Sequence, residues 1–280
     1  MSNDMSTDPL SPFIAALHAG RLRVWSIVVT IFGEAVQPRG GRAAMTELQA
    51  ITDRLGIEGG ALRTAMSRLA QDGWVTRERE GRNSFYTLSE LGRDLTLPAS
   101  RRIYRGSFCR TGPWTIAVSE TQAEAAKNGS AEHMPSFSIT RQVRVIDPGD
   151  AAQHRAAGDL VLQGTPEEIP DWVHVAAIGP FITAEYANLS ALLEPLTPEA
   201  LAGLQPLDAL AMRVLLSHAW RRLVLRHPAP PEGLTGSGWP GEVCHAALAH
   251  LYPALLEPSE QWWATPTSAE GRGVLNARFR

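Results

Sequence analysis

The chain has 280 residues, of which 44% are hydrophobic and 20% are charged, and its formal net charge is −3. This length excludes a single small disulfide-stapled domain and suits two or three globular units with buried cores. The charge is unevenly spread, because residues 1–20 carry −2, residues 21–110 carry +6 and residues 111–280 carry −7. A basic segment before an acidic remainder is expected when one domain meets a polyanion and the rest has another task.

Nothing near the N-terminus predicts export or a membrane anchor. Residues 1–20 have neither the basic nor the apolar region of a signal peptide, and we expect them to form a flexible arm. The apolar stretch 27–32 is much shorter than the ~20 residues of a membrane-spanning helix. Cys109 and Cys244 form no CxxC pair, as is typical of reduced thiols. We therefore expect a soluble, cytoplasmic protein.

Three helices are predicted in the basic segment. Residues 23–36 are apolar on nearly every side, which indicates a buried helix. Residues 46–55 have one apolar face, a capping box of Thr46 and Gln49 at their start, and a glycine just after their end. Residues 61–72 follow after a short turn and again have one apolar stripe.

A β-hairpin is predicted after the third helix. Residues 74–79 and 84–88 are rich in β-forming residues and flank the turn sequence EGRN. Three helices, with a short turn between the second and third, followed by a hairpin, have the element order of a winged helix-turn-helix. Residues 21–97 are therefore predicted to be a DNA-binding domain.

The third helix and the hairpin carry the predicted DNA contacts. The apolar stripe of the helix must face its own domain, so the polar side chains between its members turn outward. Arg donates two hydrogen bonds to guanine, Ser and Thr reach base edges or phosphates, and hairpin arginines suit phosphates or a minor groove. The predicted contacts are Arg63, Thr64, Ser67 and Arg68 in the helix and Arg77, Arg79, Arg82 and Asn83 in the hairpin. One alternative is that they form the solvated face of an ordinary helical domain. Another is that the helix-turn-helix serves as a dimerisation or protein-contact module.

The rest of the chain is predicted to form two further domains. Residues 98–178 read as a small α+β domain, in which residues 122–135 are a short helix or a loop. Its strands are expected over residues 114–120, 137–147, 159–164 and 172–178. Residues 179–280 read as a helical domain, with helices expected over residues 187–196, 206–227 and 242–258.

Two blocks of sequence carry a family resemblance. WSIVVTIFGEAVQPRGG followed by LRTAMSRLAQDGWVTREREGRNSFYTLSELG, within residues 23–95, resembles the amino-terminal domain of the PaaX family, repressors of phenylacetate degradation. HAWRRLVLRHPAPPEG and WPGEVCHAALAHLY are similar to that family's C-terminal region. The resemblance implies a dimeric transcriptional repressor with a ferredoxin-like middle domain, released from a palindromic operator by an aryl-CoA such as phenylacetyl-CoA. It also makes residues 179–280 the effector and dimerisation domain.

A polar cluster within the C-terminal block is the predicted effector site. It consists of His218, Trp220, Arg221 and Arg222. Paired arginines suit the phosphates of CoA, and a tryptophan can stack on an adenine or aryl ring. The alternative is that leucines of the same segment bury one helix face while the arginines are solvated or ion-paired.

The sequence predicts no catalytic site, no cofactor and no metal site. GxSxG, HExxH and P-loop motifs are absent, and His245 and His250 are poorly spaced for one metal ion. The predicted fold class is α+β and mainly helical: a winged helix-turn-helix, a small α+β middle domain and a helical C-terminal domain. Two other functions stay open: a CoA-binding module or enzyme in residues 98–280 with an accessory basic domain, and an interaction scaffold whose winged helix binds no DNA.

Overall fold

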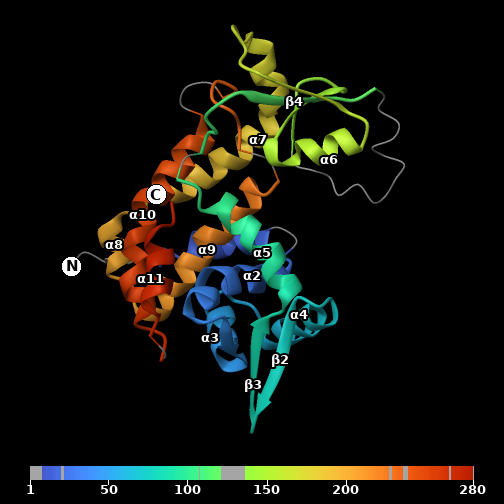
Figure 1. Ribbon diagram of the computed structural model, residues 1–280. Helices are drawn as coiled ribbons and strands as arrows, with labels where there is room; N and C mark the ends of the chain where they lie inside the picture. The colour runs from blue at the N-terminus through green and yellow to red at the C-terminus, as the bar shows by residue number, and fades with distance from the viewer. Residues whose placement is uncertain are drawn as a thin grey trace, which may run out of the picture. The chain divides into compact units, whose positions relative to one another are not determined.

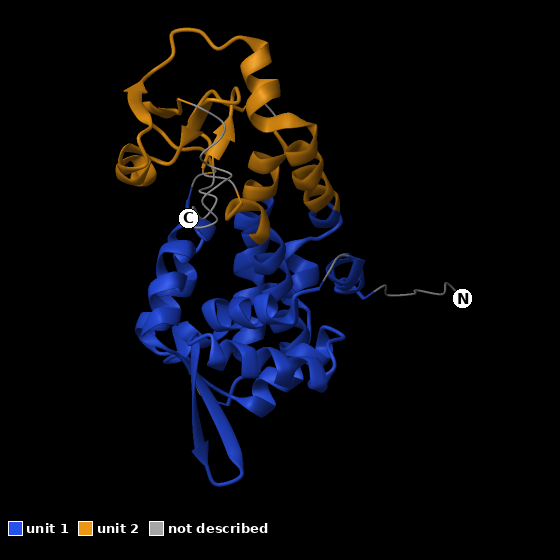
Figure 2. Ribbon diagram, turned by 90° about the vertical axis from the view of Figure 1, so that its right-hand side faces the viewer, with its two compact units in different colours: residues 1–106, 192–221, 247–280 blue, residues 107–191, 222–246 orange. Residues whose placement is uncertain are grey.

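The structure is a computed structural model that describes residues 8–19, 22–106, 108–120, 136–226, 229–235, 239–264 and 266–279. The chain divides into two compact units (Figure 2). Unit 1 comprises residues 1–106, 192–221 and 247–280, and unit 2 comprises residues 107–191 and 222–246. Both units therefore combine segments that are far apart in the sequence. No helix in the described ranges is long and apolar enough to cross a membrane.

Unit 1 is a helical assembly with one small sheet (Figure 1). Its antiparallel sheet has the strand order β1-β3-β2, formed by β1 (Arg42–Ala44), β2 (Val75–Glu80) and β3 (Asn83–Leu88). Its helices are α1 (Ser11–Ala19), α2 (Val24–Ile31), α3 (Met45–Arg54), α4 (Gly59–Gln71), α5 (Glu90–Ile103), α8 (Pro198–Ala202) and α11 (Ala269–Asn276), joined by most of α9 (Pro206–Val224) and the second part of α10 (Pro240–Glu260).

Most elements predicted in the basic segment are present. The hairpin pairs Val75 with Leu88 through Glu80 with Asn83, as the turn sequence predicts. The predicted capping box of Thr46 and Gln49 is wrong, because α3 begins at Met45 and the carboxylate of Glu47 accepts the backbone N–H of Ala44 at 2.7 Å.

The segment expected to be a flexible arm contains helix α1. Leu10, Phe13 and Leu17 are buried in unit 1, and the burial of these apolar side chains stabilises the helix Ser11–Ala19. His18 Nε2 lies 2.9 Å from the carbonyl oxygen of Leu55, which adds a polar contact to α3's C-terminal end.

Unit 2 contains a four-stranded antiparallel sheet. The strand order is β5-β6-β4-β7, formed by β4 (Trp114–Val118), β5 (Ser136–Ser138), β6 (Val143–Ile146) and β7 (Leu160–Gly164). A 3₁₀ turn η3 (Pro148–Asp150) and α6 (Ala151–Ala156) lie between β6 and β7, and α7 (Asp171–Leu193) follows. Beside this sheet, Trp239 packs as an apolar anchor, with ring centroids 4.7 Å from Tyr186 and 5.1 Å from Phe108.

Two strand predictions in unit 2 are wrong. Residues 137–147 form two strands instead of one, because the chain reverses between them and Ile139 N–H donates to the carbonyl of Val143. Residues 172–178 are helical, and their buried members Val173, Ala177 and Ile178 recur at helical spacing. Their β-branched and aromatic composition favoured a strand, but burial along one helix face decides the structure. The predicted helix or loop at residues 122–135 lies outside the described residues.

A carboxylate lies in the core of unit 1. Glu34 has no exposed surface, and its Oε1 is 3.1 Å from Nε of Arg213 and 2.7 Å from Nη1 of Arg278. Burying a charge costs several kcal/mol unless opposite charges and hydrogen bonds compensate it. Both carboxylate oxygens of Glu34 also accept hydroxyl hydrogen bonds, from Tyr104, Ser217 and Tyr252. The cluster thus joins α2's continuation to α5, α9, α10 and the end of α11.

The backbone around Glu34 is itself adapted to this cluster. Glu34 lies in a π-helical turn, η1 (Phe32–Val36), in which the N–H of Gln37 donates to the carbonyl of Phe32 instead of that of Gly33. Arg278 donates to the carbonyls of Gly33 and Glu34 at 2.8 and 2.9 Å. Its side chain therefore supplies donors to carbonyls that the wider turn leaves available.

Burial and charge fix the protonation of the groups around Glu34. Burial raises the pKa of the Tyr104 hydroxyl and of the Tyr252 hydroxyl, so both remain donors at neutral pH. Burial alone would lower the pKa of Arg278, but the charge of Glu34 and the contacts with Tyr104 and Tyr252 together outweigh it, and the pKa is raised.

Replacing Glu34 by Gln is expected to lower the free energy of unfolding by about 3–5 kcal/mol, because two buried guanidinium groups lose their counter-charge. Urea denaturation of the full chain measures this change. The matched control is Glu58→Gln on the exposed surface before α4, expected to stay within about 0.5 kcal/mol of the parent. Equal stability of the Glu34 and Glu58 variants would show that the buried cluster contributes no net stabilisation.

Candidate nucleic-acid interface

Helix α4 presents one apolar and one polar face. Its buried side chains are Leu62, Ala65, Met66 and Leu69, and the four predicted DNA-contacting side chains, Arg63, Thr64, Ser67 and Arg68, are all exposed. This division follows from the helical period, since the apolar residues recur at intervals of three and four. The polar face of α4 is therefore open to a partner.

The polar side chains of α4 make only weak contacts within the protein. Arg68 lies 3.5 Å from Asp72, an exposed pair one helical turn apart that stabilises little. Thr64 donates to the carbonyl of Gly60 at 3.0 Å. Arg63 has no carboxylate within ion-pair distance among the described residues. A ligand would displace few interactions from this surface.

The hairpin separates its charges by face. Arg77 and Arg79 alternate with Glu78 and Glu80 along β2, so the arginines project from one side of the sheet and the glutamates from the other. The arginine side also carries the buried Val75, Tyr86 and Leu88, which pack on the helices. Arg77 and Arg79 therefore lie on the side of the sheet that faces the helices, farther toward the tip than the buried Val75. Figure 1 shows β2 and β3 extending beyond the helices.

An arginine of the same sheet partly offsets the negative charge on the glutamate side of the hairpin. Arg42 of β1 pairs with Glu80 and lies 3.8 Å from Glu78, and its guanidinium stacks 3.6 Å from the ring centroid of Phe85. The hydrogen bond from Arg42 lowers the pKa of the Glu80 carboxyl. At the tip, the predicted residues Arg82 and Asn83 are exposed. The polar face of α4, the arginine side of β2 and the tip together form what we call the basic surface.

The predicted effector cluster is divided by the structure. His218 and Trp220 are buried: His218 Nδ1 lies 2.9 Å from the hydroxyl of Thr30, and the indole N–H of Trp220 donates to the carbonyl of Ile103 at 2.8 Å. Arg221 is half-buried and donates to the same Thr30 hydroxyl at 2.8 Å. Arg222 is exposed. Three of the four side chains thus pack α9 against α2 and α5.

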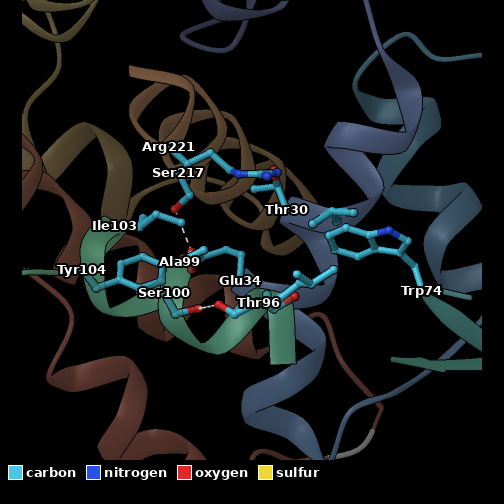
Figure 3. A pocket seen from close by; sticks show the side chains of 13 residues that line it. Thr30, Glu34, Trp74, Thr96, Ala99, Ser100, Ile103, Tyr104, Ser217 and Arg221 are labelled. Carbon is cyan, nitrogen blue, oxygen red and sulfur yellow. Dashed lines mark hydrogen bonds between the residues drawn. The ribbon is translucent and has the colours of Figure 1, made fainter. Parts of the chain in front are cut away.

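Arg221 also lines a small cavity within unit 1. Figure 3 shows Trp74 on one side of it and Tyr104 on the other, with Thr30 and Glu34 between them. Its volume is about 50 Å³. A cavity needs at least about 10–15 Å³ to hold one water molecule. This one therefore has room for a few waters and not for a cofactor-sized molecule.

The sequence prediction missed the residues around Glu34 and Tyr104. Glu34 stands alone as an acid in the otherwise apolar stretch 24–36, and that isolation was an available signal of a buried, partnered charge. Arg213 carries a similar signal as the lone charge in the apolar stretch 209–216, but nothing local connects it or Arg278 to Glu34, because both lie in segments remote in sequence.

Comparisons with known proteins extend these observations. The family model described as PaaX-like protein matches residues 23–92, and that of the PaaX-like protein C-terminal domain matches residues 180–265. Together these ranges span more than half of the chain. The chain is 29% identical over 267 residues to the transcriptional repressor PaaX of Escherichia coli (strain K12), which covers 86% of this chain and 84% of that protein. The uncharacterized protein Rv0674 from Mycobacterium tuberculosis has a similar fold, with a TM-score of 0.50 and 20% identity, over 77% of this chain and 89% of that chain.

The hairpin and α5 approach each other closely at Gly92, where an added Cβ would lie 2.2 Å from the carbonyl oxygen of Trp74. Gly92→Ala is expected to lower the free energy of unfolding by about 1–3 kcal/mol through overpacking. Chemical denaturation measures the effect. Gly273→Ala in α11 is the control, because its Cβ would meet no atom within 4 Å and alanine favours the helix. An equally stable Gly92 variant would disprove a rigid contact between Trp74 and α5.

Proposed function

Because the chain belongs to the PaaX family, we propose that it is a DNA-binding transcriptional repressor of phenylacetate catabolism and not an enzyme. The observation that carries this proposal is the basic surface: α4 contacts β2 and exposes its polar face, and the arginines of β2 project from the side of the sheet that packs on the helices. The printed description of the E. coli relative as a transcriptional repressor supports the same function.

In this proposal residues 21–97 act as a winged helix-turn-helix. Helix α4 enters the major groove, where Arg63, Thr64, Ser67 and Arg68 meet base edges. The hairpin is the wing, whose Arg77, Arg79, Arg82 and Asn83 lie along the phosphates or in the adjacent minor groove. Arg42 supports this role, because it offsets one of the two negative charges that the wing's glutamates place on the side away from the helices.

The remaining segments are proposed to sense the effector and to dimerise the protein. Residues 98–178 form a ferredoxin-like middle domain in this proposal, an assignment supported by the antiparallel order β5-β6-β4-β7 with α6 between β6 and β7. Residues 179–280 carry the response to an aryl-CoA such as phenylacetyl-CoA. Two copies would occupy two half-sites about one helical turn, or a multiple of it, apart.

The proposed effector response involves the cluster on α9. Arg221 lines a cavity that also touches Trp74 at the base of the wing, and His218 shares its Thr30 partner. Trp220 fixes α9 to the end of α5. Arg222 is the exposed member of the cluster, and its neighbour Arg221 packs on α2, so a ligand at Arg222 would act next to side chains that pack against the proposed DNA-binding segment.

The double variant Arg63→Ala/Arg68→Ala tests the DNA-binding proposal. Duplexes selected from a random library by the full-length protein serve as the operator. Affinity for them is expected to fall about 100-fold or more, since each bidentate base contact is worth about 1–3 kcal/mol. Gel-shift titration at fixed salt measures the loss.

The matched control is Arg141→Ala/Arg155→Ala, which removes two exposed arginines of unit 2. It is expected to bind as the parent does, and all variants should keep the parent's melting temperature. Unchanged affinity of the α4 variant would remove α4 from the interface.

The effector proposal is tested by adding phenylacetyl-CoA, free phenylacetate or free CoA to the protein–duplex complex. Release by the thioester alone is expected, because an effector must bind the two states of the protein with different affinity. Gel shift and fluorescence anisotropy report the release. Indifference to all three compounds would contradict an aryl-CoA effector and leave the DNA-binding proposal intact.

A further inference from the structure

A second and larger pocket lies in unit 1. It is bounded by α5, α11 and the 3₁₀ turn η2 (Gln37–Arg39), and its volume is about 480 Å³. Gly33, Thr96, Ser100 and Tyr104 line both this pocket and the small cavity at Arg221, so the two are neighbours. Small-molecule sites in proteins commonly have volumes of about 300–1,000 Å³, a range that includes the larger pocket.

The walls of the larger pocket combine apolar and cationic side chains. Leu88, Leu97 and Val274 supply apolar surface, and Leu97 is 61% exposed although it is a large hydrophobic residue. Val274 is 50% exposed and lines the same pocket, so two exposed hydrophobic side chains share one concave surface, which is typical of ligand-binding grooves. The pocket therefore has an apolar surface on which the apolar group of a ligand can bind.

Two arginines flank that apolar wall. Arg93, Leu97 and Arg101 are four residues apart along α5, so they lie on one face of the helix, with the arginines about 12 Å apart along its axis. Both arginines are exposed, and neither has a carboxylate within ion-pair distance among the described residues. None of the described residues lining the pocket is Asp or Glu. The rim therefore attracts anions.

We propose that this pocket binds an amphipathic anion, with an acyl or aromatic group against Leu97 and Val274 and phosphates or a carboxylate at Arg93 and Arg101. Guanidinium groups form paired, charge-assisted hydrogen bonds with both kinds of anion. The inference rests on the proposed function in one respect: it places the effector of the repressor in this pocket, next to the cavity at Arg221, and not on the cluster of α9 itself.

One residue that lines the pocket belongs to the hairpin itself. Leu88, one of its lining residues, is the last residue of β3, and Arg93 donates to the Leu88 carbonyl at 2.9 Å. The next residue, Ser89, caps α5 by accepting the N–H of Gly92 at 3.0 Å. A ligand in the pocket thus touches the base of the hairpin directly, and it can shift the DNA-binding arrangement if it favours one position of that base.

Two variants test the pocket by different means. Val274→Trp fills it with a large side chain. Arg93→Ala/Arg101→Ala removes the cations at two exposed positions, and because Arg93 also donates to the Leu88 carbonyl, the melting temperature of this variant is compared with that of the parent. Val243→Trp, a valine of similar exposure on α10 that does not line the pocket, is the control for the first. Arg141→Ala/Arg155→Ala is the control for the second.

Isothermal titration of the full chain without DNA, using phenylacetyl-CoA, CoA and phenylacetate separately, measures binding. Saturable binding of at least one probe is expected. Val274→Trp should weaken it about tenfold or more, and the arginine variant should weaken it about tenfold and reduce its salt dependence. Both controls should bind as the parent does. Tight binding of CoA alone would show that Arg93 and Arg101 bind the phosphates of the ligand. Binding of phenylacetate would show that they bind a carboxylate.

The outcomes separate this inference from the proposed function. Parent-like binding by both pocket variants, or no saturable binding of any probe by the parent, would overturn the inference. If the thioester still releases DNA from both variants as it does from the parent, the effector proposal survives and the pocket assignment fails. If the probes bind in a way that Val274→Trp blocks but never release DNA, the pocket assignment survives and the effector proposal fails.

Discussion

The buried carboxylate of Glu34 is the constraint on which unit 1 depends. Arg213 comes from α9 and Arg278 follows α11, so one acid from the N-terminal part of the chain holds two cations from the C-terminal part. Because each buried ion requires the others, the cluster favours one arrangement of these segments over looser ones. The N-terminal and C-terminal regions therefore form one cooperative structure in unit 1, although they are widely separated in sequence.

This arrangement brings the C-terminal helices into direct contact with the segment proposed to bind DNA. Thr30 of α2 receives contacts from both His218 and Arg221, and Ile103 at the end of α5 is held by Trp220. Helix α5 in turn begins at the base of the hairpin. A small-molecule signal in this unit does not need to cross a flexible linker, because the elements that would bind it already pack on the elements that would bind DNA.

Local elements could be predicted from the sequence where one physical signal dominates. The apolar period fixed the exposed face of α4, and the EGRN turn fixed the hairpin. The strand predicted at residues 172–178 failed because β-branched composition does not distinguish a strand from a buried helix. The surroundings of Glu34 could not be predicted, since its partners lie 179 and 244 residues away in Arg213 and Arg278.

The alternation of Arg and Glu along β2 has a consequence for how this hairpin tolerates insertions and deletions. The four charged residues of β2, Arg77 to Glu80, sum to zero, so the difference in charge between the two faces of this strand depends on its register and not on its composition. A slip of β2 by one residue would exchange the two faces and turn both glutamates toward the helices. A single-residue insertion or deletion that shifted β2 in this way would thus reverse the sign of the charge on each face while the four charged residues stay the same.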